Sequence, residues 1–149
     1  MDLNDEIFIN APQDVVYAGL NDPDILKQCI PGCEELIKHS DTELEAKVVL
    51  RVGPVKAKFG GNVVLDPSKA PAGFSLSGEG NGGLAGFAKG GADVELEAQD
   101  GGTLMRYDVD VNVGGKIAGV GQRLLEMVSR TLTQQALDRL AKVIVERAG

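Results

Sequence analysis

The chain has 149 residues, the usual length of one domain that buries its own hydrophobic core. Its 22 acidic and 15 basic residues give a net charge of −7, which disfavours nucleic acid partners and unaided attachment to anionic lipid. Because no apolar run approaches the ~20 residues of a membrane span and the start is acidic, we expect one cytoplasmic domain over residues 1–149.

The first thirty residues predict one strand followed by two short helices. Residues 3–10 alternate loosely between apolar and polar side chains, a pattern typical of a strand. Residues 13–30 place apolar side chains at helical spacings, and Pro12 suits the first turn of a helix. Asn21-Asp22-Pro23 interrupts this stretch, and Asp22 is well placed to cap the second helix.

The middle of the chain predicts successive antiparallel strands. Between Pro31-Gly32 and Asn112 the sequence alternates apolar and polar residues, with turns at Gly53-Pro54, residues 67–73 and Asp100–Gly102. Such alternation is typical of antiparallel strands that have one buried and one solvated face. Parallel strands would need crossover helices, which this part of the sequence lacks.

The C-terminal part of the chain predicts one long helix. Gly114-Gly115 ends the last strand, and residues 116–147 then place apolar side chains every three or four positions, over ~45 Å. A helix of this length needs an apolar surface to pack on, and the apolar face of the sheet provides it. The predicted fold is α+β: a curved antiparallel sheet of about seven strands wrapped around the long helix, with two short helices after the first strand. This is the helix-grip arrangement.

A glycine-rich segment, Gly78–Gly91, contains a match to G-x-G-x-x-G, the fingerprint of a dinucleotide-binding turn. That turn must follow a parallel strand and begin a helix. Here the flanking segments alternate as antiparallel strands, so we interpret the match as a hairpin. The hairpin carries two larger apolar residues, Leu84 and Phe87, and two interpretations stay open: a structural connection, or a mobile flap that meets a cavity or a partner.

The inward-facing positions leave two interpretations open: a cavity that binds an apolar ligand, or dense packing of the same side chains against the long helix. The candidate lining residues are Phe59, Phe74, Leu76, Val94, Met105, Tyr107, Leu124 and Val128. Tyr107 is the single polar residue at the inward strand positions. Its hydroxyl is either a core group bonded to backbone or water, or a donor to a ligand carbonyl such as that of a quinone. We expect no catalytic residues, because no acid–base pair falls on the inward face.

Cysteine and histidine give no metal-binding pattern. Cys29 and Cys33 are spaced C-x3-C, and the one histidine, His39, lies in a polar turn. We therefore predict no metal site and interpret both cysteines as small packing residues beside the Pro-Gly turn.

Six segments in the same order give the whole chain a family resemblance. It resembles the CoxG family of carbon monoxide dehydrogenase subunits, within the START-like (SRPBCC) superfamily of helix-grip domains. The segments that carry the resemblance are Ala11-Pro12, Asp22-Pro23, Cys29–Leu36, Val52–Gly61, Gly78–Leu96 and Tyr107–Leu125.

The resemblance implies a non-catalytic accessory protein that serves a molybdenum-containing hydroxylase of the carbon monoxide dehydrogenase type. Such proteins link the enzyme to the cytoplasmic membrane and its respiratory chain. START-like domains bind apolar molecules between sheet and helix, so a quinone or a lipid is the expected ligand, with no covalently bound cofactor. Longer relatives have a hydrophobic C-terminal extension, whereas this sequence ends at Gly149. We therefore expect no membrane anchor in this chain, and a peripheral location at the inner membrane face only through a partner.

Two other functions remain as alternatives. In the first, the chain is an assembly or docking factor that uses its acidic outer face and the Gly80–Gly91 loop, with no ligand. In the second, it is a START-like cyclase or hydrolase. Formation of a homodimer also stays open.

Overall fold

The computed structural model describes residues 1–148. These residues form seven strands, three α-helices and two short 3-10 helices. In chain order the elements are β1 (Asp2–Ile9), α1 (Gln13–Leu20), α2 (Pro23–Cys29), β2 (Cys33–Lys38), β3 (Glu43–Val52), β4 (Val55–Asp66), β5 (Gly73–Asn81), η1 (Gly83–Ala85), β6 (Phe87–Gln99), β7 (Gly102–Gly114), η2 (Lys116–Val120) and α3 (Gln122–Ala148).

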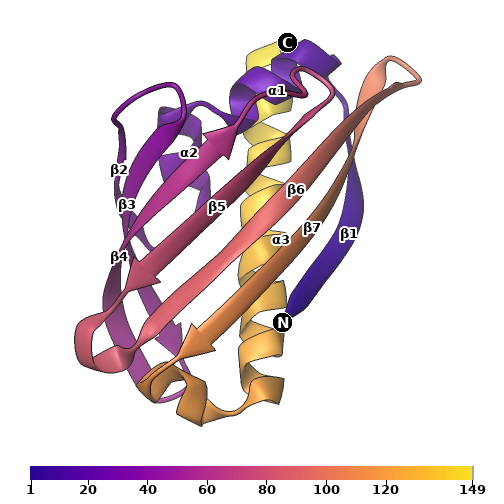
Figure 1. Ribbon diagram of the computed structural model, residues 1–149. Helices are drawn as coiled ribbons and strands as arrows, with labels where there is room; N and C mark the ends of the chain where they lie inside the picture. Colours follow the sequence, from indigo (N-terminus) through magenta and orange to yellow (C-terminus); the bar gives the residue numbers. More distant parts are fainter. Residues whose placement is uncertain (149) are drawn as a thin grey trace.

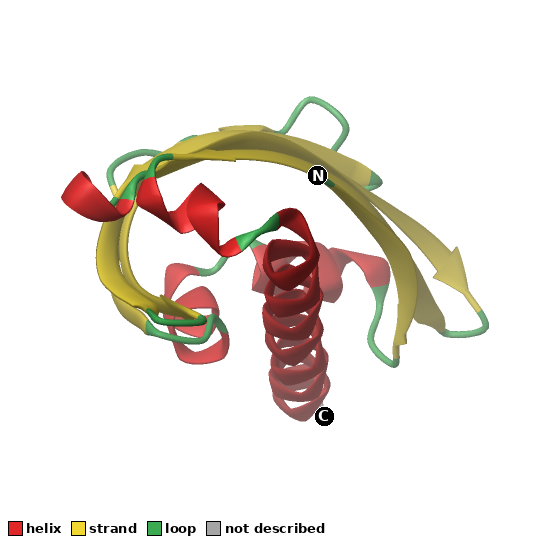
Figure 2. Ribbon diagram, turned by 90° about the horizontal axis from the view of Figure 1, so that it is seen from below, coloured by secondary structure: helices red, strands yellow, loops and turns green. Residues whose placement is uncertain are grey.

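The strands form one antiparallel sheet that curves around α3 (Figure 1). The strand order is β1-β7-β6-β5-β4-β3-β2, so β1 and β2 are the two edges. Viewed along the helix, the sheet arches over α3 and leaves it on the concave side (Figure 2). The predicted helix-grip fold is confirmed, including the number of strands and the two short helices after β1.

The short helices α1 and α2 pack against the C-terminal half of α3 at one end of the concave face. Asp22 caps α2 as predicted: its Oδ1 accepts hydrogen bonds from the backbone N–H of Asp24 at 2.9 Å and of Ile25 at 3.4 Å. Gly19 of α1 lies so close to Ile144 of α3 that an added Cβ would meet the Ile144 side chain at 2.6 Å. The missing side chain at this position therefore permits the close approach of the two helices.

The long helix begins later than the sequence pattern predicts. Residues 116–120 form the 3-10 helix η2, and α3 starts at Gln122. Gly121, between them, has a φ of +101°, which no residue of an α-helix adopts. The apolar spacing of residues 116–120 reflects a turn that packs on the sheet, because Ile117 is buried there.

The glycine-rich segment is mostly strand. β5 extends to Asn81 and β6 begins at Phe87, so the connection is only the turn Gly82–Gly86, in which the N–H of Gly82 donates to the carbonyl of Gly86 at 2.8 Å. The predicted loop Gly80–Gly91 is therefore corrected to a five-residue turn that contains η1. No parallel strand or α-helix flanks the G-x-G-x-x-G match, so the context of a dinucleotide-binding turn is missing.

The hydrophobic core has two separate parts. The larger part joins α1, α2 and the C-terminal half of α3 to the sheet, and its fully buried side chains include Ile9, Val16 and Ile144. The smaller part lies at the opposite end, under η1 and η2, and is built around Val52, Phe59, Ala85 and Ile117. The candidate site lies between these two clusters.

Candidate functional site

A cavity with a volume of about 410 Å³ lies between the concave face of the sheet and the first half of α3. Strands β3 to β7 form its sheet side. The helical side consists of Ile117, Leu125, Val128, Ser129 and Leu132.

The cavity is hollow because two rows of small residues cross the sheet. In one row, Gly61 of β4 and Gly80 of β5 are paired, and Ala46 and Ala88 continue the row on β3 and β6. In the next row, Gly78 of β5 pairs with Gly90 of β6. All six residues line the cavity. Since glycine and alanine bring almost no side chain, the concave face is recessed along these rows.

The apolar side chains around the cavity are only half-buried, although they face inward. Val48, Leu50, Val109 and Val111 are examples. At the other end of the sheet, inward-facing side chains such as that of Leu96 are fully buried by the helices. A bound molecule that covered this apolar surface would gain roughly 25 cal/mol of favourable free energy for each Å² removed from water. The cavity is thus an apolar surface that a bound molecule would stabilise.

Polar side chains are few in the part of the cavity that the structure describes. Ser129 of α3 is its one hydroxyl-bearing lining residue. Glu79 and Lys89 also border the cavity, but they are exposed, lie opposite each other on β5 and β6, and occupy the outward-facing positions between the glycines. Within the described lining, no acidic and basic side chain converge on the cavity.

The predicted lining residues divide into two groups. Phe59, Leu76 and Val128 line the cavity. The remaining five lie elsewhere, as follows: Phe74, Val94 and Met105 in the larger core cluster, Leu124 in the smaller one, and Tyr107 in a separate groove.

The correction at Phe74, Val94 and Met105 follows from the packing of α1. The ring of Phe74 meets that of Tyr17 edge-on, with centroids 5.8 Å apart, so α1 occupies the space in front of this part of the sheet. Leu124 lies outside the cavity for a different reason. It packs beneath the β3–β4 turn, where an added Cβ at Gly53 would lie 3.0 Å from Leu124 Cδ2.

Tyr107 lies in a polar groove of about 430 Å³ between β1 and α3, not in the apolar cavity. It faces inward as predicted but stands opposite Asp5 of the edge strand β1. The groove also contains Arg130 of α3. Burial raises the pKa of the Tyr107 hydroxyl, the Asp5 carboxylate raises it further, and the Arg130 guanidinium lowers it. The candidate partner for a ligand carbonyl within the cavity is therefore Ser129, which the alternation of the strands did not indicate.

Leu84 and Phe87 lie at the turn between β5 and β6. Leu84 is 97% exposed and forms the tip of η1, between Gly83 and Gly86, which both have positive φ. Phe87 is half-exposed, and its ring occupies the space that a side chain at Gly114 would fill. Neither residue lines the cavity.

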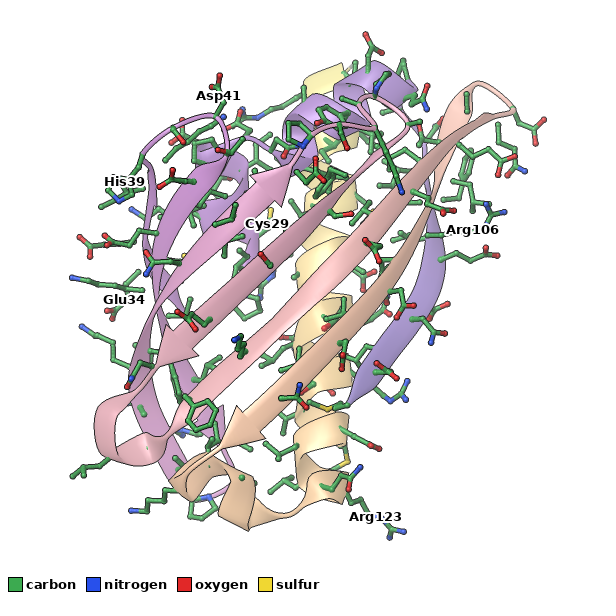
Figure 3. All side chains as sticks on the ribbon, in the orientation of Figure 1. Cys29, Glu34, His39, Asp41, Arg106 and Arg123 are labelled. Atoms are coloured by element: carbon green, nitrogen blue, oxygen red, sulfur yellow. The ribbon has the colours of Figure 1, made fainter. Side chains whose placement is uncertain are left out.

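The cysteines are free thiols in unlike surroundings. Cys29 is 1% exposed and belongs to the larger core cluster, which agrees with a packing role. Cys33 is half-buried, and its thiol donates to the Glu35 carbonyl at 3.4 Å. Burial raises the pKa of both thiols. His39 is exposed at the connection between β2 and β3, and its Nε2 lies 3.8 Å from Glu45 Oε2 (Figure 3). Over residues 1–148, no cluster of three metal-ligating side chains occurs.

The sequence of the chain identifies its family. The model of the CoxG family, a family of carbon monoxide dehydrogenase subunits, matches residues 6–145. The chain belongs to this family. The resemblance carried by six short segments is thereby confirmed, and it extends over nearly the whole chain. No curated protein sequence matches the chain.

Solved structures support the same fold. A conserved protein from Geobacillus kaustophilus has a TM-score of 0.90 and 28% identity, with 100% of this chain and 98% of that one covered. The Zhui aromatase/cyclase from Streptomyces sp. R1128 has a TM-score of 0.69 and 13% identity, over 100% and 96% of the chains. Norcoclaurine synthase from Thalictrum flavum has a TM-score of 0.64 and 14% identity, over 100% and 96%. The likeness to the two enzymes shows the START-like helix-grip fold alone.

No helix among residues 1–148 has both the length and the apolar character that crossing a bilayer requires.

Proposed function

We propose that this chain is a non-catalytic accessory protein that binds an apolar molecule in the cavity between the sheet and α3. The observation that carries the proposal is the recessed, half-exposed apolar surface that the paired glycines Gly61 and Gly80 create. A volume of about 410 Å³ lies within the range of small-molecule sites, which is roughly 300–1,000 Å³. A packed core would have filled this space with larger side chains.

The ligand class we propose is a quinone or an isoprenoid-like lipid. Such a molecule is apolar over most of its surface, which suits walls of valine, leucine and glycine. A quinone also has carbonyl oxygens, and the hydroxyl of Ser129 is a donor for one of them.

The partner we propose is a molybdenum-containing hydroxylase of the carbon monoxide dehydrogenase type, whose electrons a bound quinone would carry to the respiratory chain. The family name supports this partner, because it describes a subunit of carbon monoxide dehydrogenase. The enzyme neighbours favour a cyclase or synthase as the other function. The absence of a converging acid–base pair in the described lining favours binding over that chemistry.

Thermal unfolding with short-chain ubiquinone and menaquinone analogues tests the binding role. A ligand at a hundred times its dissociation constant adds about 2.7 kcal/mol to the free energy of unfolding, which raises the Tm of a domain this size by roughly 5–10 °C. We expect such a rise with at least one analogue. If no quinone or lipid analogue raises the Tm, the ligand-binding role is wrong. Retention of the hydroxylase by the ligand-free protein would then favour the docking role.

A further inference from the structure

The polar groove between the edge strand β1 and the middle of α3 is a second space for a small molecule. Its volume is about 430 Å³, and β1 runs beside the helix along it (Figure 1). Eight of the nine residues that line the groove have polar side chains, and Leu3 is the exception. The groove has no lining residue in common with the apolar cavity, so the two spaces are distinct.

A polar pair interrupts the apolar inner face of the sheet at this groove. The other inward-facing residues of β1 are apolar: Leu3 and Ile9 are buried, and Ile7 packs against the larger core cluster. Asp5 occupies the inward-facing position between them and stands directly opposite Tyr107 of β7. A carboxylate at an inward-facing position is costly where a helix covers it, and it is tolerated here because the groove leaves Asp5 exposed.

Arg130 of α3 contributes a third functional group to the same place. The Asp5 carboxylate raises the pKa of the Tyr107 hydroxyl and the Arg130 guanidinium lowers it, so both charges act on one hydroxyl. Glu126 lies one helical turn before Arg130, where an acidic residue pairs favourably with arginine. Glu126 instead accepts a hydrogen bond from Gln122 at 3.3 Å, and within residues 1–148 Arg130 forms no ion pair. The guanidinium therefore remains available to a molecule in the groove.

The Tyr107 hydroxyl is also open to the groove. Among the described residues it has no hydrogen-bond partner, and these residues contain no buried side-chain oxygen or nitrogen that lacks one. The hydroxyl is therefore accessible, and it can both donate and accept a hydrogen bond. Asp5 and Arg130 do not neutralise each other either, because no ion pair within 4.0 Å joins them over the described part of the chain.

Opposite charges on the two walls of a groove favour a ligand that carries both charges. A carboxylate alone would bind Arg130 and be repelled by Asp5, and a cation alone would be repelled by Arg130. A molecule with a carboxylate and an ammonium group satisfies both walls, because a guanidinium binds a carboxylate through paired hydrogen bonds and Asp5 accepts from the ammonium. Thr133 and Gln135 of α3 offer further hydrogen-bonding groups to a polar side chain of such a ligand.

We propose that the groove binds a small zwitterion of the amino-acid type. Arg130 binds its carboxylate, Asp5 binds its ammonium group, and the Tyr107 hydroxyl is a further hydrogen-bond partner. The inference goes beyond the proposed function, because it concerns a separate site and a ligand of different chemistry. The two sites are adjacent, since Leu3 of the groove pairs with Val109 of the cavity. The chain then has room for two unlike molecules at once.

Titrations followed by NMR test the proposal. The standard L-amino acids are added singly to the isotope-labelled full chain, and the backbone amide shifts are recorded. We expect at least one amino acid to give saturable shifts that centre on Asp5, Tyr107 and Arg130. Its N-acetyl derivative, which lacks the ammonium group, and its C-terminal amide, which lacks the carboxylate, should each bind at least about tenfold more weakly. The proposal is wrong if no amino acid gives saturable shifts at the groove, or if either derivative binds as tightly as the parent.

Single substitutions assign the three groups. Arg130→Gln and Asp5→Asn should each weaken binding at least about tenfold, and Tyr107→Phe should weaken it about 2–10-fold. The matched controls are Arg123→Gln on the same helix (Figure 3) and Asp2→Asn on the same strand. Both remove one charge from an exposed residue outside the groove. The amide spectrum of each variant reports whether it is folded. Equal losses in a variant and its control would overturn the proposal, because overall charge would then explain the effect.

Thermal unfolding separates this inference from the proposed function. Arg130 does not line the cavity, so Arg130→Gln should keep the wild-type Tm rise with quinone analogues. Loss of amino-acid binding in this variant with an intact quinone response supports two separate sites. Loss of both responses would mean that one ligand spans groove and cavity, which would overturn the separate zwitterion site. In the wild type, a quinone response without amino-acid binding rejects the groove site alone, and the reverse result rejects the cavity function alone.

Discussion

Gly61 of β4 and Gly80 of β5 lie directly opposite each other, and both line the cavity. Ala46 and Ala88 extend the same row on the neighbouring strands. The glycine-rich sequence around residues 78–91 therefore has a structural purpose that differs from phosphate binding. It removes side chains from the concave face of the sheet, and the space that this leaves is the candidate binding site.

The first prediction fills that space. In Gly80→Val, the nearest atom to the new Cβ is the Gly60 carbonyl oxygen at 3.8 Å, an ordinary contact, so the sheet has room for the side chain. The valine would occupy the cavity, and we expect the affinity for quinone analogues to fall at least about tenfold, roughly 1.4 kcal/mol. Stability should hold or rise by about 0.5–1 kcal/mol, because glycine weakens a strand interior. Titration and denaturation measure the two effects.

Gly60→Val is the matched control for this variant. Gly60 is exposed, lies on the outward-facing side next to Gly61, and has open space where its Cβ would be. It receives the same substitution outside the cavity, so we expect ligand affinity to stay unchanged. Equal losses in both variants would mean that the ligand does not occupy this cavity.

The second prediction compares the packed core around α1 and the C-terminal half of α3 with the side chains that border the cavity. Ile144 is 1% exposed and packs between α1 and the sheet, so Ile144→Ala should cost about 2–5 kcal/mol of unfolding free energy. Leu132 is half-buried and already borders empty space, so Leu132→Ala should cost about 1 kcal/mol in the ligand-free protein. Urea denaturation of both variants gives the comparison. Similar losses would indicate that the cavity is closed and packed in solution.

The third prediction is that Ser129 of α3 donates a hydrogen bond to the carbonyl of a bound quinone and that Tyr107 does not. Since one hydrogen bond contributes about 0.5–1.5 kcal/mol, Ser129→Ala should weaken a carbonyl-containing quinone analogue roughly 2–10-fold and leave a pure hydrocarbon ligand unaffected. Tyr107→Phe should leave both affinities unchanged, because Tyr107 lies in the groove beside β1. The opposite pattern in a titration would restore Tyr107 as the ligand contact.

The fourth prediction concerns the two thiols. The buried Cys29 should resist iodoacetamide, whereas the half-buried Cys33 should be alkylated first. Because burial raises both pKa values, alkylation of Cys33 should increase mainly above its ordinary pKa of about 8.5. For Cys29 the neutral thiol is favoured in the folded state, so its contribution to stability is complete below that ordinary value and is lost as pH rises through the raised pKa. Mass spectrometry of the alkylated protein reports both sites, and rapid labelling of Cys29 in native buffer would contradict the packing role.

Periodicity was sufficient to predict the elements of the fold, because alternation and helical spacing are local properties of the sequence. The Asp22 cap and the long C-terminal helix follow directly from such patterns. The sequence did not predict where each inward-facing side chain lies along α3, because that depends on which elements cover which part of the sheet. Phe74 and Phe59 both face inward, yet α1 buries the first in the solid core while the second borders the cavity.

Pairings between distant residues were also beyond the sequence pattern. The row through Gly61 and Gly80 depends on strand register, which a single strand does not reveal.

Native mass spectrometry of the freshly purified protein, followed by solvent extraction, tests the central claim most directly. We expect a stoichiometric added mass that extraction identifies as a quinone or an isoprenoid-like lipid, present in wild type and Gly60→Val and lost in Gly80→Val. A clean ligand-free mass that stays unchanged after incubation with quinones would contradict the account. A ligand retained equally by Gly80→Val would place the binding site outside the glycine-lined cavity.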